Sequence, residues 1–127
     1  MAPQEQRPAA PTRKRPWDPF VALCEAHGLP VPEREWRFAP PRRWRFDYAF
    51  PAQRITVEQE GGVWTAGRHT RGRGFEADCV KYAEATLRGW RVFRASPRQM
   101  RDGTVIGWLR RMEVAGVYVE GVAGGLA

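Results

Sequence analysis

Hydrophobic and polar residues alternate in three short stretches between residues 35 and 60, a period of two that is typical of β-strands. The first stretch, 35–38, stops before two prolines. The second, 44–50, places four aromatic residues on one face and three others on the opposite face: Trp44, Phe46, Tyr48 and Phe50 against Arg45, Asp47 and Ala49. The third, 55–60, places Ile55 and Val57 opposite Thr56, Glu58 and Glu60. A fourth strand is predicted at 90–94.

Three segments have helical spacing instead. Asp18 and Pro19 predict the N-cap and first residue of a helix that places Phe20, Leu23, Cys24 and His27 on one face and ends at Gly28. A second helix is predicted at 75–88, and its apolar stripe consists of Phe75, Cys79, Tyr82, Ala83 and Thr86. Cys79 is therefore expected in the core. A third, short helix is predicted at 104–112.

The predicted order is α-β-β-β-α-β-α, which indicates an α+β (mixed α/β) fold with a small mixed sheet flanked by helices. A chain of 127 residues suffices for one modest core, expected over residues 17–113. Residues 1–16 are Pro-rich and basic and predict a disordered arm. Residues 61–74 predict a flexible basic loop, and the Gly-rich, apolar segment 114–127 is expected to be flexible or at an interface.

Charge then narrows the class of partner. Lys and Arg number 21 against 14 Asp and Glu, a formal net charge of +7, which favours polyanionic partners and nucleic acid first. No apolar run predicts a signal peptide or a membrane span, and two cysteines make no disulfide framework. A cytoplasmic protein is expected. No glycine-rich nucleotide-binding motif is present, so no organic cofactor is expected.

The second and third strands together predict a cluster of carboxylates. A hairpin folded about residues 52 and 53 pairs Tyr48 with Val57 and sets Asp47 directly opposite Glu58. Opposed like charges destabilise a sheet, so the pair requires a shared proton or a cation. A hard divalent ion such as Mg²⁺, with Mn²⁺ as a substitute, fits two carboxylates. Glu60 lies on the same face, and the carbonyl of Gln59 is a further candidate ligand for one or two ions.

A simpler interpretation of the same face remains open. In this register Arg45 lies opposite Glu60, so the two side chains can form an ordinary ion pair. An exposed, solvated hairpin face would also carry such charges without any metal.

The segment after Glu60 adds cations beside the carboxylates. Arg68, Arg71 and Arg73 are candidates for holding DNA phosphates, and the glycines between them let the backbone come close. His69 is a candidate general acid or base, because its ordinary pKa lies near neutrality. A plain surface histidine is the alternative.

On the next helix Asp78 and Lys81 are i, i+3 neighbours, which most often form a surface ion pair. The alternative directs Lys81 into the site as a phosphate-binding or nucleophile-orienting cation. Cys24 and His27 have the spacing of half a zinc site, but no second pair completes it.

These pieces together resemble the PD-(D/E)XK nuclease superfamily, in particular the branch similar to very-short-patch repair endonucleases and phage Holliday junction resolvase-like proteins. The resemblance covers roughly residues 20–112 and rests on five stretches: Trp44–Pro51, Val57–Gly62, Gly67–His69, Asp78–Tyr82 and Gly89–Arg94. It implies a mixed sheet flanked by helices and Mg²⁺-dependent hydrolysis of DNA phosphodiesters.

Residue by residue, the resemblance makes Asp47 the first acidic ligand and Glu58 the acid of the (D/E)XK element. Glu60 occupies the position where many members have Lys, and His69 matches a histidine of the repair-endonuclease-like branch. Two departures matter: Phe46, not Pro, precedes Asp47, and the cation that Glu60 replaces must come from Lys81 or His69. The expected catalytic set is therefore Asp47, Glu58, Glu60, His69 and Lys81.

The sequence thus predicts a metal-dependent DNA endonuclease, with branched DNA as the favoured substrate and a homodimer as the expected assembly. The resemblance is also compatible with a phage protein that acts in its host's cytoplasm. The DNA-binding candidates are Arg45, Arg68, Arg71, Arg73 and Arg94. Two alternatives remain: a strand-nicking mismatch-repair enzyme, and a non-catalytic module that binds nucleic acid through its arginines and exposed tryptophans.

Overall fold

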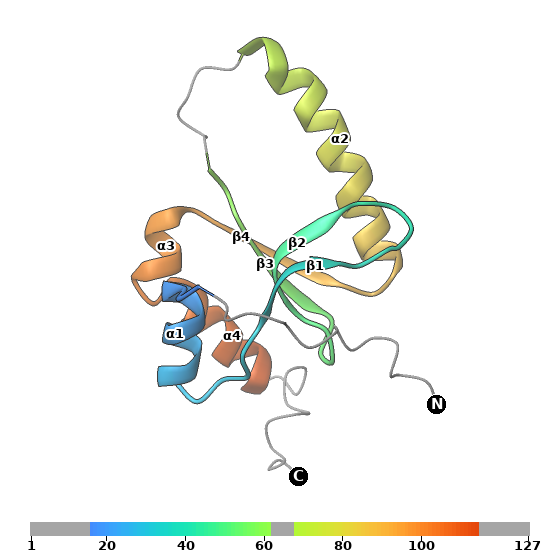
Figure 1. Cartoon of the computed structure of the whole chain (residues 1–127). Coiled ribbons are helices and arrows are strands. Elements are labelled where there is room, and N and C mark those ends of the chain that lie inside the picture. The colour runs from blue at the N-terminus through green and yellow to red at the C-terminus, as the bar shows by residue number, and fades with distance from the viewer. Residues whose placement is uncertain (1–15, 62–67, 115–127) are drawn as a thin grey trace, which may run out of the picture.

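The computed structural model describes residues 16–61 and 68–114, and side chains only in 16–61 and 74–113. The elements run α1 (Pro19–Ala26), β1 (Glu33–Arg37), β2 (Arg45–Phe50), β3 (Ile55–Gln59), α2 (Arg68–Leu87), β4 (Arg91–Ala95), α3 (Pro97–Arg101) and α4 (Thr104–Val114), as Figure 1 shows. The predicted basic arm and the C-terminal Gly-rich segment lie almost wholly outside the described residues.

The four strands form one mixed sheet in the order β1-β2-β3-β4. The pairs β1–β2 and β2–β3 are antiparallel, whereas β3 and β4 are parallel and are connected through α2. The predicted α+β class is confirmed. The hairpin register is also the predicted one, because Tyr48 pairs with Val57 and Phe50 with Ile55.

Helices cover the two faces of the sheet, and a separate core lies under each group. One core joins the sheet to α1, α3 and α4 and includes Phe50, Val57 and Leu109. The other lies between the sheet and the C-terminal part of α2, where Ala85 packs near Phe46 and Trp90. The first turns of α2 project away from the sheet (Figure 1). No helix in the described part of the chain has the length and hydropathy to cross a membrane.

Helix α1 begins where the sequence predicts. The Asp18 carboxylate accepts hydrogen bonds from the N–H groups of Phe20 and Val21, which stabilises the first turn. Its second oxygen accepts the hydroxyl proton of Tyr48 at 2.8 Å and lies 3.4 Å from the Arg34 guanidinium. This cap therefore also fastens α1 to the sheet.

The short helix α3 was missed in the sequence, although its signal is local. Ser96 accepts a hydrogen bond from the N–H of Gln99, and the Gln99 side chain accepts one from the N–H of Ser96. This reciprocal pair is a capping box, and Pro97 occupies the first helical position.

The prediction of a flexible loop through residue 74 was wrong at its C-terminal end, because α2 already begins at Arg68. Gly72 and Gly74 disfavour a helix by only about 1 kcal/mol each, a local preference that the rest of the helix overrides. The predicted apolar stripe was also wrong. Phe75 is 66% exposed, and Cys79, predicted in the core, is exposed as well.

The helix instead turns another face to the sheet. Ala85 is buried, and Lys81, Tyr82 and Glu84 are half-buried. Polar contacts made by Lys81 and Tyr82 to the sheet, described below, account for this orientation. A periodicity of apolar residues does not register such contacts.

The alternation predicted for β2 fails at Asp47. Tyr48 and Phe50 belong to the core under α1, α3 and α4, but Phe46 packs on the α2 side with Ala49. Two irregularities coincide there. Glu35, which lies between the β1 residues that pair with Tyr48 and Phe46, has φ +53°, and the backbone N–H of Asp47 donates to a side chain. Strict alternation requires regular strand geometry, which this point lacks.

Candidate functional site

The candidate site is centred on Glu58, a β3 residue that is 4% exposed on the α2 side of the sheet. Its Oε2 accepts the backbone N–H of Asp47 at 2.8 Å. Its Oε1 accepts hydrogen bonds from Lys81 Nζ at 3.1 Å and from the Tyr82 hydroxyl at 3.0 Å. A carboxylate this deeply buried is stable only with such partners.

Thr56 lies beside the same carboxylate but is not a fourth donor. Its hydroxyl oxygen is 3.4 Å from Glu58 Oε2 and 2.8 Å from the carbonyl oxygen of Tyr48. A hydroxyl has one proton, and the shorter bond uses it. Glu58 therefore accepts three hydrogen bonds and keeps one of a carboxylate's roughly four acceptor positions.

Asp47 meets Glu58 reciprocally across the hairpin. While the N–H of Asp47 donates to Glu58, the Asp47 Oδ2 accepts the N–H of Gln59 at 2.8 Å. Asp47 is half-buried. Within the described part of the chain, its carboxylate accepts this one hydrogen bond. Asp47 thus has most of its acceptor positions available beside a carboxylate that has few.

The surroundings of Glu58 act on its pKa in opposite directions. Burial is the largest cause and raises the pKa of Glu58 above its ordinary value. The positive charge of Lys81 and the Asp47 N–H lower this pKa, and the negative charge of Asp47 raises it again; the net shift is upward.

Lys81 supplies the cation that the facing carboxylates require. It is half-buried on α2, and its Nζ lies 5.8 Å from the ring centroid of Phe46 and 5.1 Å from that of Tyr82. Its ion pair is with Glu58, whereas Asp78 is exposed. The surface pair expected for Asp78 and Lys81 is therefore not formed in the described part of the chain. Lys81 points to Glu58 instead, and its role as a phosphate-binding or nucleophile-orienting cation stays a prediction.

Tyr82 was expected on the apolar stripe of its helix and was not among the candidate site residues. Its hydroxyl donates to Glu58, and the Arg94 guanidinium lies 4.9 Å from its ring centroid. Burial, followed by the charge of Glu58 and the hydrogen bond to it, raises the pKa of the Tyr82 phenol. The available signal was its place on the stripe of the helix that the sequence predicted to pack inward.

Glu60 is engaged by Arg94 and not by Arg45. Arg94 Nε lies 2.6 Å from Glu60 Oε2, and its Nη2 lies 3.2 Å from Oε1, a two-point pairing of guanidinium and carboxylate. The hydrogen bond that Arg94 donates to Glu60 is the main cause that raises the pKa of Arg94. Arg45 instead lies 3.8 Å from Glu35. The Arg45–Glu60 pair that the sequence left open as an alternative is not formed, because the parallel partner strand β4 supplies the nearer cation.

The metal-ligand set proposed from the sequence is only partly assembled. Within residues 16–61 and 74–113, no three His, Cys, Asp or Glu side chains gather as a metal site. Asp47 and Glu58 form a pair, both oxygens of Glu60 bind Arg94, and Gln59 contributes its N–H to Asp47. Two carboxylates still suffice for a Mg²⁺ ion that keeps several waters.

Four further candidates have no described side chain. Arg68, His69, Arg71 and Arg73 lie in the first turns of α2, where the structure describes the backbone alone.

Cys24 is fully buried, and burial raises the pKa of its thiol to about 12, as expected for a core residue and not for a zinc ligand.

Comparisons with models of known protein families, with characterised proteins and with solved structures found no match. The resemblance to PD-(D/E)XK nucleases therefore stays a prediction from the sequence.

Proposed function

We propose that this protein is a metal-dependent DNA endonuclease whose reaction centre consists of Asp47, Glu58 and Lys81. One observation carries the proposal: two acids from adjacent strands face each other beside a half-buried lysine that pairs with one of them. Such a set is costly to keep for structure alone, since buried ion pairs are often replaceable by hydrophobic residues without loss of stability.

The donor set fits a hard divalent cation. Asp47 has free acceptor positions, Glu58 keeps one, and carboxylate oxygens are the ligands that Mg²⁺ prefers. When bound there, such an ion would polarise a phosphate and lower the pKa of a bound water. Asp47 and Glu58 are the residues that would hold it.

The other side chains then have distinct tasks. Lys81 would be able to turn from Glu58 toward a phosphate oxygen, because a bound cation would then compensate the negative charge of Glu58. Tyr82 keeps the Glu58 carboxylate oriented through its hydroxyl. Arg94 pairs with Glu60 and lies over the Tyr82 ring. We therefore assign Arg94 to the support of Tyr82 and Glu60, in place of the direct DNA binding that the sequence suggested.

We propose branched DNA as the substrate, because a domain of this size holds little room for a sequence-reading element and backbone contacts are independent of sequence. Cleavage of both strands of a symmetric junction calls for a two-fold dimer, which is part of the same proposal.

The deciding experiment measures cleavage of a labelled four-way junction, a matched linear duplex and a single strand, with Mg²⁺ or with EDTA. The proteins are wild type, Asp47→Asn and the control Asp78→Asn. Both variants remove one negative charge, but Asp78 is exposed on α2 outside the carboxylate pair. We expect metal-dependent cleavage of the junction by wild type and Asp78→Asn, and its loss in Asp47→Asn.

A second candidate, a non-catalytic DNA-binding module, is favoured by the internal compensation of Glu58 by Lys81 and of Glu60 by Arg94. The same experiment separates the two. Folded wild-type protein that binds all three DNAs but cuts none with Mg²⁺ or Mn²⁺ would establish the binding module. Cleavage of the duplex alone would keep the active site and remove the preference for junctions.

A further inference from the structure

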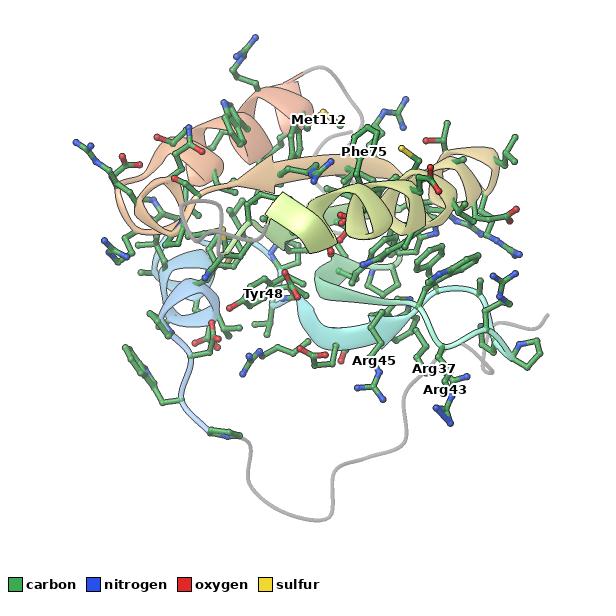
Figure 2. All side chains as sticks on the ribbon, turned by 90° about the horizontal axis from the view of Figure 1, so that it is seen from above. Arg37, Arg43, Arg45, Tyr48, Phe75 and Met112 are labelled. Carbon is green, nitrogen blue, oxygen red and sulfur yellow. The ribbon has the colours of Figure 1, made fainter. Side chains whose placement is uncertain are left out.

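A basic hairpin, here residues 33–45, comprises β1, the turn after it and the first residue of β2. It holds five arginines and two glutamates, a net charge of +3 out of the chain's +7. Figure 2 shows Arg37, Arg43 and Arg45 at one border of the molecule, away from α2. Apart from Arg45, none of them was a binding candidate in the sequence.

Two of these arginines face each other directly. Arg37 of β1 is the register partner of Arg45 of β2, and like charges in that position destabilise a sheet. Neither is strongly neutralised. The Arg37 guanidinium donates to the carbonyl oxygens of Pro41 and Arg42, at 3.1 and 3.0 Å, and Arg45 lies 3.8 Å from the exposed Glu35. Arg37 thus holds the turn in place while its charge remains.

The turn also carries a column of stacked planar groups. The Arg42 guanidinium lies 3.9 Å from the ring centroid of Trp44, and Trp44 stacks on Phe38 at 5.8 Å. Phe38 in turn stacks on Phe46 at 4.1 Å. Since Lys81 contacts the far side of this column at Phe46, the column runs from an exposed arginine to the candidate reaction centre. Arg42 is therefore a preorganised cation and not a freely moving one.

Arg42 and Arg43 are exposed and have no carboxylate partner within the described part of the chain. A stacked guanidinium with free N–H groups is suited to bind phosphate oxygens. A membrane surface fits less well. Binding to a membrane surface would need exposed hydrophobic side chains beside the arginines. The large hydrophobic residues that the structure shows exposed are Trp17, Val31, Phe75, Val80 and Leu87, and none of them lies in the basic hairpin.

We infer that the basic hairpin binds the phosphodiester backbone of a nucleic acid through Arg42, Arg43 and Arg45. On the proposed function, the bound strand leads to the Asp47–Glu58 pair. Strand β2 itself makes this connection, because its rise of about 3.3 Å per residue puts the α-carbons of Arg45 and Asp47 roughly 7 Å apart.

The test measures equilibrium binding to a labelled junction, duplex and single strand in EDTA, so that no cleavage is needed, over a range of salt concentrations. Arg42→Ala/Arg43→Ala is compared with Arg98→Ala/Arg111→Ala. The control pair removes the same charge from exposed positions on α3 and α4. RNA of the same sequence and vesicles containing phosphatidylserine are parallel probes.

We expect the hairpin variant to weaken binding roughly tenfold at moderate salt, and to reduce the slope of log affinity against log salt by about 0.9 for each lost phosphate contact. The control pair should change both far less. The comparison of RNA with DNA shows whether the affinity depends on the sugar as well as on the phosphates.

Equal losses in both variants would overturn the inference, since they would mean that net charge alone drives binding. So would an unchanged affinity of the hairpin variant for nucleic acid, or a loss confined to vesicles. Nuclease activity is scored separately. A hairpin-dependent affinity without any cleavage keeps this inference and removes the proposed function, and cleavage with hairpin-independent affinity does the reverse.

Discussion

Lys81 of α2 and Glu58 of β3 form an ion pair at 3.1 Å, with side chains that are 17% and 6% exposed. Twenty-three residues separate them in the chain, so this contact joins the helix to the sheet at the candidate reaction centre. Breaking such a pair from one side leaves a buried charge without its partner, which is more damaging than removing both.

The first prediction is a coupling between these two residues. We expect Lys81→Met to lower the free energy of unfolding by about 2–4 kcal/mol, because Glu58 loses its cation. In the double variant Glu58→Gln/Lys81→Met, part of this loss should be recovered. Urea denaturation of wild type, the two single variants Glu58→Gln and Lys81→Met and the double variant measures the coupling energy. Strictly additive losses would contradict the prediction.

The second prediction concerns pH in metal-free protein. Because burial raises the pKa of Glu58 in the folded state, its contribution to stability is complete below the unfolded value near 4.5 and declines as pH rises through the folded value. The stability of wild type relative to Glu58→Gln should therefore fall as the pH rises above the unfolded value near 4.5. Denaturation in EDTA at several pH values measures this difference, and a constant or rising difference would refute the assigned direction.

The third prediction separates Glu60 from the two central acids. Since Arg94 holds both oxygens of Glu60, we expect Glu60→Gln to keep DNA cleavage within a few-fold of wild type. Asp47→Asn should reduce it by about a hundredfold or more, because a metal ligand contributes several kcal/mol to the transition state. Single-turnover rates with Mg²⁺ provide the comparison. An equal loss in both variants would return Glu60 to the metal site.

The fourth prediction concerns the two thiols. Cys24 is fully buried with a pKa raised to about 12, while Cys79 is exposed on α2. A disulfide reagent at pH 8 should therefore modify one cysteine rapidly and the second only on unfolding. Cys79→Ser should abolish the rapid phase, and a rapid phase that survives this substitution would show that Cys24 is accessible.

The sequence alone was enough for the local features of this protein. The period of two in residues 44–60 and the turn between its two strands determined the hairpin register, and with it the meeting of Asp47 and Glu58. Asp18 and Pro19 determined the start of α1. In each case the physical cause lies within a few residues of the feature, in a backbone hydrogen bond, a cap or a pleat.

The partners of the charges, by contrast, depended on the tertiary structure. Glu60 binds Arg94 because a parallel strand brings that arginine beside it, and Lys81 reaches Glu58 because α2 turns a polar face to the sheet. Phe46 likewise lies on the α2 side of the sheet, and not on the same face as Tyr48 and Phe50 as strict alternation predicted. The sequence offers several Arg and Lys residues as partners for each acid, and only the packing of strands and helices selects among them. The reason is that the energy of an ion pair depends on the distance between the charges and on the exclusion of water.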